Sequence, residues 1–139
     1  MNKKWCLFFL ILGFVFNGYC FGKKKALEGN WKTIALIKNG QEQKLYDSSI
    51  DFTAGGAFYE TKGRAGVNLF NVYVKDKGKS IETFGMANTG FRGTGEAMEY
   101  EDMFFDAFLN SDSYKIKNNI LYFYNHEKNL ELRLEKSLE

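Results

Sequence analysis

The sequence of 139 residues contains no proline, two cysteines and one histidine. The lack of proline excludes proline-rich linkers and collagen-like segments. Cys6 and Cys20 both lie near the start, so a domain without that segment has neither a disulfide nor a thiolate metal site. A zinc site needs several His or Cys ligands, and His126 alone cannot supply them. We therefore expect no metal and no cofactor.

Residues 1–22 have the order of a secretory signal peptide, with lysines, then an apolar run over 5–16, then small residues. The run is shorter than the roughly 20 apolar residues of a membrane-spanning helix. Ordinary cleavage at 20–22 is favoured. Lipid attachment at Cys20, for which Tyr19 is a poor neighbour, and an uncleaved anchor stay open. We expect an exported protein of the periplasm or cell envelope, an outer-membrane lipoprotein if Cys20 is modified, with residues 23–139 as one domain. Membrane contact is expected only through this N-terminal segment or a lipid on Cys20.

Once this segment is removed, the chain has no excess of positive or negative charge. The full chain has 19 Lys and Arg against 17 Asp and Glu, so losing Lys3 and Lys4 leaves a neutral chain. A nucleic-acid interface needs a clustered basic face. We therefore expect no nucleic-acid partner.

The remaining sequence is dominated by short β-rich runs separated by turn residues. Asn39-Gly40 and Asn118-Asn119 are typical of hairpin turns. Leu130, Leu132 and Leu134 alternate with charged residues, which predicts a strand with one wet face. The predicted strands are 31–37, 50–52, 57–61, 67–74, 80–84, 114–117, 120–124 and 130–135.

One helix interrupts the strands. Residues 96–110 place five apolar side chains at helical spacing: Ala97, Tyr100, Phe104, Ala107 and Phe108. The acids of this segment, Glu99, Glu101, Asp102 and Asp106, are interpreted as a solvated face. The glycine-rich stretch 85–95 is interpreted as a flexible connection into the helix.

Catalytic motifs are lacking as well. Gly78-Lys79-Ser80 ends like a phosphate loop, but Tyr73 stands where that motif needs glycine. There is no Gly-x-Ser-x-Gly elbow, and His126 lies in a segment typical of a solvated turn. We predict that the protein is not an enzyme.

Aromatic residues are abundant, at 17% of the chain. They would either fill a core or line an apolar cavity, because both use the same side chains. Core filling is favoured. The residues considered for a cavity are Phe52, Phe58, Phe70, Tyr73, Phe84, Phe104, Phe108, Tyr122 and Phe123.

Four segments together resemble the META domain, the module of HslJ-like bacterial envelope proteins. They are Leu27-Glu-Gly-Asn-Trp31, Gly63-Arg-Ala-Gly-Val-Asn-Leu-Phe70 with Tyr73, Asn88-Thr89-Gly-Phe91 with Ala97-Met-Glu-Tyr-Glu101, and the closing hairpin before the Leu-rich strand. Val67 replaces a frequent cysteine of the family, and Asn71 stands in the usual glycine place, where we expect an altered turn. The matching residues are interpreted as structural: Trp31, Gly63, Gly66, Asn68, Phe70, Tyr73, Thr89, Met98, Glu99, Glu101 and Phe104.

The resemblance implies an α+β fold, with a curved antiparallel sheet or partly open barrel of about 7–8 strands and one main helix, about 96–110, packed on it. It implies no catalytic residue. We expect an exported, non-enzymatic module for interaction or stress response in the envelope, with an undefined protein partner. The alternative is a carrier for a small apolar ligand or lipid inside an aromatic-lined barrel.

Overall fold

The computed structural model of the protein describes residues 25–138. The predicted signal segment, including Cys20, lies outside the described residues. Within residues 25–138, no helix is long and apolar enough to cross a membrane.

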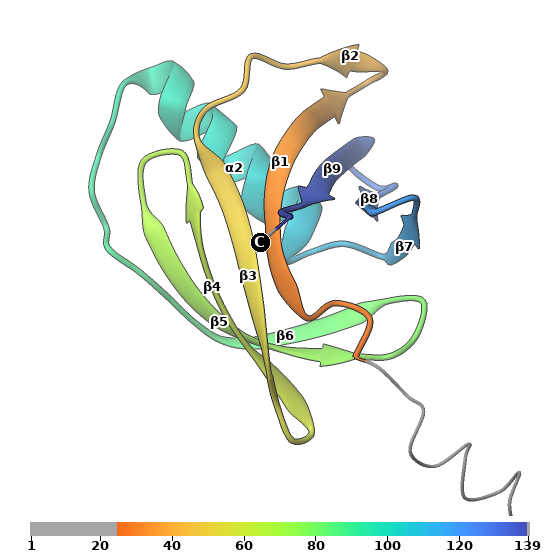
Figure 1. The fold of residues 1–139 in the computed structure, drawn as a ribbon. Coiled ribbons are helices and arrows are strands. Elements are labelled where there is room, and N and C mark those ends of the chain that lie inside the picture. The colour runs from red at the N-terminus through yellow and green to blue at the C-terminus, as the bar shows by residue number, and fades with distance from the viewer. Residues whose placement is uncertain (1–24, 139) are drawn as a thin grey trace, which may run out of the picture.

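The fold is an antiparallel sheet curled into a half-barrel around one helix (Figure 1). Along the sheet the strand order is β6-β5-β4-β3-β1-β9-β8-β7, and the short β2 pairs with β1. The predicted α+β class with a curved sheet and a single main helix is therefore confirmed. The elements are β1 Gly29–Lys38, β2 Gln41–Glu42, β3 Ser48–Gly55, β4 Phe58–Ala65, β5 Leu69–Asp76, β6 Ile81–Asn88, α2 Gly95–Phe108, β7 Ser113–Lys117, β8 Ile120–Asn125 and β9 Leu130–Lys136.

The sheet consists of two meanders joined by the pairing of β1 with β9. Strands β3 to β6 follow one another as neighbours, and so do β7 to β9. The join runs from the Trp31–Lys136 pair to the Lys38–Leu130 pair. Segments at opposite ends of the described chain therefore lie side by side at the centre of the sheet (Figure 1).

The local signals in the sequence explain the ends of several elements. Thr94 caps α2 by accepting a hydrogen bond from the Ala97 N–H at 3.3 Å. The helix spans Gly95–Phe108, so its end lies two residues before the predicted one. Asn118 and Asn119 both adopt positive φ, at 54° and 63°, as a two-residue hairpin between β7 and β8 requires.

Helix α2 fills the concave side of the sheet. Its Phe104 and Phe108 are fully buried, and both rings lie about 6.0–6.3 Å from each other and from Phe70 of β5. Each buried aromatic ring removes a large apolar area from water, which is the main stabilising contribution in a domain without disulfides. The favoured interpretation, in which rings fill the core, is confirmed for Phe52, Phe70, Phe104, Phe108 and Phe123.

Four of the nine residues considered for a cavity lie outside the core instead. Phe58, Tyr73 and Phe84 are 39%, 44% and 42% exposed, and Tyr122 is half-buried. Their placement follows from strand geometry. Phe58, Tyr73 and Tyr122 occupy positions that point to the convex side next to buried residues that point inward. Phe84 pairs with Tyr73 and therefore lies on the same face. The prediction that these side chains face the interior was wrong.

His126 lies in the turn after β8 with an exposed side chain, in agreement with its interpretation as a turn residue. The Asp112 carboxylate accepts hydrogen bonds from the His126 N–H and approaches its Nδ1, both at 2.6 Å. Burial alone would raise the pKa of Asp112, but these hydrogen bonds and one from Ser113 outweigh it and hold the pKa below its usual value.

We expect Asp112→Asn to lower the free energy of unfolding at pH 7 by less than about 1 kcal/mol, because the site is partly exposed. A lowered pKa stabilises the fold above the unfolded-state value of about 3.9, and this contribution disappears as the pH falls through the folded-state pKa. Urea unfolding at pH 7 and pH 3 should therefore show a difference from wild type that shrinks in acid. Asp102→Asn, an exposed change of the same charge, is the control. A difference that is constant from pH 7 to pH 3 would contradict the assignment.

Candidate functional site

A buried carboxylate links the helix to the turn between β4 and β5. Glu101 of α2 is only 5% exposed, so its interpretation as part of a solvated face was wrong. Its two oxygens accept hydrogen bonds from the backbone N–H and the side-chain Nδ2 of Asn68, both at 3.0 Å. Two donors to a buried carboxylate are a strong interaction, since a buried charge is costly unless its oxygens are satisfied.

Asn68 extends this link to the segment that leads into the helix. Its Oδ1 accepts hydrogen bonds from the Thr89 hydroxyl at 2.8 Å and from the Phe91 N–H at 2.6 Å. Its Nδ2 also donates to the Phe91 carbonyl at 2.9 Å. We call Asn68, Thr89 and Glu101 the polar bracket. Residues 85–88 of the predicted connection belong to β6, and the bracket hydrogen-bonds to Thr89 and Phe91. The flexibility of residues 85–95 stays a prediction.

Two further motif residues support the bracket. Gly66 adopts a φ of +81° and donates its N–H to the Asp47 carbonyl at 2.8 Å, a conformation that favours glycine. The Met98 sulfur accepts a hydrogen bond from the Gly93 N–H at 3.4 Å. The first contact fixes the turn before Asn68, and the second fixes the segment between Phe91 and α2.

The other predicted site residues lie apart from the bracket. Trp31 is buried in β1 and donates its indole N–H to the Leu27 carbonyl at 2.8 Å. Phe70 and Phe104 belong to the core, and Glu99 is exposed on α2. Gly63 lies in β4, and Tyr73 lies on the convex face of β5.

The order of these segments has a counterpart among known families. A family model for the META domain matches residues 25–137. The chain belongs to the META domain family. The fold of this META domain also resembles a solved structure, the NMR structure of a protein from Burkholderia xenovorans, with a TM-score of 0.65 at 12% sequence identity over 81% of this chain and 85% of that one. No curated protein matches the chain.

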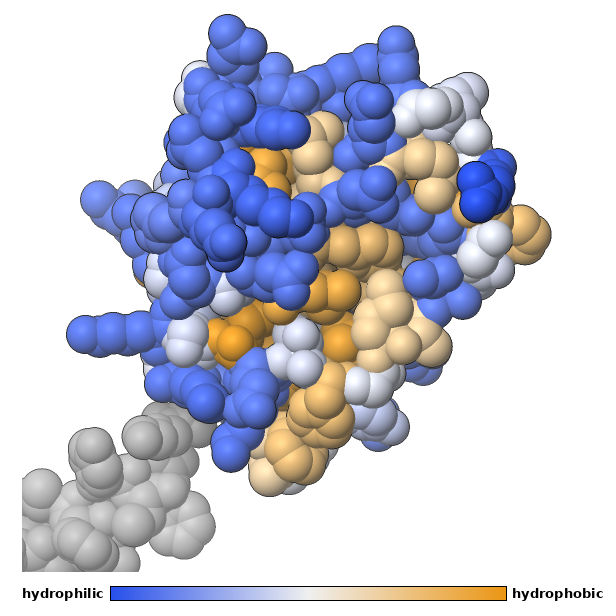
Figure 2. All heavy atoms as spheres, turned by 180° about the vertical axis from the view of Figure 1, so that it is seen from behind, coloured by the Kyte–Doolittle hydropathy of each residue, from blue (hydrophilic) through white to orange (hydrophobic). Residues whose placement is uncertain are grey.

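The convex face of this META domain carries a cluster of exposed aromatic rings. Phe58 packs edge-on against Phe84 at 4.9 Å between ring centroids, and Tyr73 stacks on Phe84 at 5.4 Å. We call Phe58, Tyr73 and Phe84 the aromatic ridge. Figure 2 shows apolar surface gathered around strand β6 and the tip of the β3–β4 hairpin, while much of the rest of that side is hydrophilic. The rings therefore form one patch rather than scattered exposed residues.

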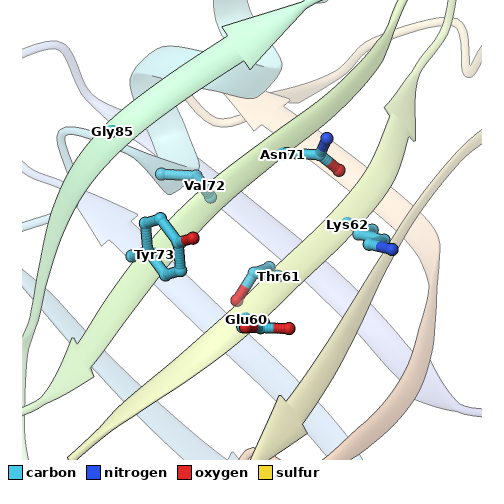
Figure 3. Close-up of a pocket in the computed structure, with 7 residues that line it drawn as sticks. All are labelled: Glu60, Thr61, Lys62, Asn71, Val72, Tyr73 and Gly85. Carbon is cyan, nitrogen blue, oxygen red and sulfur yellow. The ribbon is translucent and has the colours of Figure 1, made fainter. Parts of the chain in front are cut away.

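Three shallow depressions lie beside the ridge, with volumes of about 240, 300 and 340 Å³. All three are lined by Asn71, and together their linings reach from β3 to β6. We call this group of depressions the outer trough. Figure 3 shows its part nearest the ridge, where Tyr73 and Asn71 on β5 lie next to Glu60 and Lys62 on β4. Asn71 lies inside a strand, so the expected altered turn at this position was wrong.

Glycine shapes the trough at the β6 side. Gly85 adopts a φ of +66° where the β5–β6 register shifts, and a Cβ there would lie 3.1 Å from the Tyr73 ring. The missing side chain leaves the trough open between β5 and β6. The sequence analysis did not identify Asn71, Lys62 or Gly85 as binding residues. The signal that could have found the trough is the presence of polar residues at alternate positions of two strands that follow each other in the sequence.

The trough is lined by polar groups that are able to hydrogen-bond to a ligand. Among residues 25–138, no set of three or more His, Asp or Glu side chains is close enough to hold a metal ion. The polar groups of the trough are the Asn71 amide, the carboxylates of Asp51 and Glu60 and the Lys62 ammonium.

Proposed function

We propose that this META-domain protein is an exported, non-enzymatic interaction module of the cell envelope that holds its partner on the convex face of β3 to β6. The observation that carries the proposal is the aromatic ridge beside the outer trough. Exposed rings next to polar groups are the composition of recognition surfaces, because rings supply contact area and polar groups supply orientation.

The filled interior supports this function over the apolar carrier. The rings of α2 occupy the concave side, where Tyr100, Phe104 and Phe108 are no more than 1% exposed. A carrier would need space where these side chains pack. The convex face, by contrast, carries large side chains that are about 40% exposed, among them Phe58 and Phe84.

Site-specific photo-crosslinking tests the proposed face. We expect a photoreactive phenylalanine analogue at Phe84 to give a discrete adduct in intact cells of the natural host, because the ring lies in the contact surface. The same analogue at Tyr122, on the convex face of β8, is the matched control. Discrete adducts at both positions, or at neither, would contradict the proposal.

The mass of the mature protein from its host tests export separately. A start near residues 20–23 supports a cleaved signal, and added acyl mass on Cys20 would make the protein a lipoprotein. An intact Met1 in the cytoplasm would contradict the proposed export and would have no bearing on the proposed binding face.

A further inference from the structure

We propose that the outer trough binds a neutral oligosaccharide, with Asn71 at the centre of the binding site. The proposal rests on the interaction function given above and adds the chemical class of the ligand. It is carried by an unpartnered amide, a balanced set of charges and an exposed ring on three neighbouring strands.

Asn71 is the central observation. Its side chain lies in the middle of β5, where asparagine is disfavoured, and forms none of the side-chain hydrogen bonds found among residues 25–138. An amide carries two N–H donors and an acceptor oxygen. The fold does not require an amide at this position, where β-branched residues are preferred, so the exposed amide is available to a ligand.

The charges around Asn71 favour a ligand without net charge. Asp51 and Glu60 supply two carboxylates, while Lys62 and Arg64 supply two cations, and all four line the trough. A polyanion would be repelled by the acids and a polycation by the bases. A sugar hydroxyl is both donor and acceptor, so neighbouring hydroxyls match acids, bases and amides in one row.

The trough suits an extended chain rather than a compact molecule. Its three parts each have a volume near or below the roughly 300 Å³ at which small-molecule pockets begin, and they lie around Asn71 on strands β3 to β6. Four strands span about 14 Å at the usual spacing of about 4.8 Å. That length accommodates a few linked sugar rings.

The walls of the trough provide apolar contacts for such rings. Tyr73, at 44% exposure, bounds one side, and Leu69, at 49%, bounds the other. The C–H faces of sugar rings pack on aromatic and aliphatic surface of this kind. The Thr89 N–H donates to the Leu69 carbonyl at 3.1 Å, so the polar bracket holds this wall in position.

Tyr122 of β8, another aromatic residue on the convex face, has no comparable free ring face. Tyr122 of β8 already has Lys115 over its ring at 4.9 Å and Arg133 at 5.6 Å. Because these cations occupy the ring faces, we expect no sugar stacking there. Tyr122 therefore provides a matched aromatic control.

The experiment titrates the full chain, purified from an expressing host, with the β-1,4-linked tetramers of N-acetylglucosamine and of glucose, by calorimetry and by NMR with ¹⁵N labelling. We expect saturable binding of at least one tetramer, with shifts centred on Asn71 and Lys62. Asn71→Val and Tyr73→Ser should each weaken binding at least tenfold, and Tyr122→Ser should change it less than twofold. Asn71→Val should not lower the urea midpoint, which separates loss of binding from loss of folding.

Absence of saturable binding by both tetramers at 10 mM, about the weakest range such contacts reach, would overturn the oligosaccharide proposal. Binding that survives Asn71→Val would also overturn it, because the ligand would then lie elsewhere. If crosslinks at Phe84 still capture a discrete protein, the interaction function stands and only the ligand class fails. If crosslinks and titrations both fail, both proposals fall.

Discussion

Replacing Gly63 by alanine is expected to lower the free energy of unfolding by about 3 kcal/mol or more. A Cβ at this position would lie 2.1 Å from the Ser49 carbonyl oxygen and 2.6 Å from the Phe70 ring. The nearest obstacle is backbone of the paired strand β3, which cannot rotate away as a side chain would. Strands β3 and β4 would have to separate, or the Phe70 ring would have to leave its place against α2.

Urea unfolding followed by tryptophan fluorescence measures this effect, since Trp31 is buried beside the affected strands. Gly95→Ala is the matched control, because a Cβ there meets nothing within 4 Å and the residue opens α2. We expect this control to leave stability unchanged or to raise it by up to about 1 kcal/mol. Equal effects of the two substitutions would show that the close approach at Gly63 is not what requires glycine.

Removing the Glu101 carboxylate is expected to lower the free energy of unfolding by about 3 kcal/mol, the second largest effect predicted for this protein. Glu101→Ala leaves the Asn68 N–H and part of its amide buried without a partner, and an unsatisfied buried donor costs more than a lost surface contact. The bracket would loosen, and the 89–91 segment would lose its anchor on the β4–β5 turn. Amide hydrogen exchange should therefore be faster at Phe91.

Glu99→Ala is the matched control, because it removes the same side chain from an exposed position on the same helix. We expect its effect to stay within about 0.5 kcal/mol. Glu101→Gln should recover part of the loss, since one side-chain oxygen can still accept from Asn68. If Glu99→Ala and Glu101→Ala cost the same, the bracket does not stabilise the fold.

Much of the fold could be predicted because its signals are local. The alternation of Leu130, Leu132 and Leu134 predicted β9, and all three point into the core. The spacing from Ala97 to Phe108 predicted α2 and the face that it buries. Asn118-Asn119 predicted the β7–β8 turn. In each case a few adjacent residues decide the structure.

The site was harder to predict because it depends on strand pairing. Glu101 has the sequence context of an exposed helical acid, and only the position of Asn68 in the folded chain shows why it is buried. Phe58, Tyr73 and Phe84 look like core residues until the register places them on the convex face. The trough likewise exists only when Lys62 and Asn71 pair across two strands. These contacts join residues that are distant in the sequence, so they cannot be predicted before the strand pairing is known.

The pairing of β1 with β9 also constrains when the chain can fold. Trp31 cannot form all its native contacts until Lys136 has left the ribosome, because the two residues are paired at the centre of the sheet. Contacts between segments so distant in sequence make folding slow. In a chain that emerges progressively, β1 therefore lacks its second neighbouring strand until β9 is available. For a protein that is exported through a narrow channel, late folding of this kind would keep the chain unfolded while it passes through.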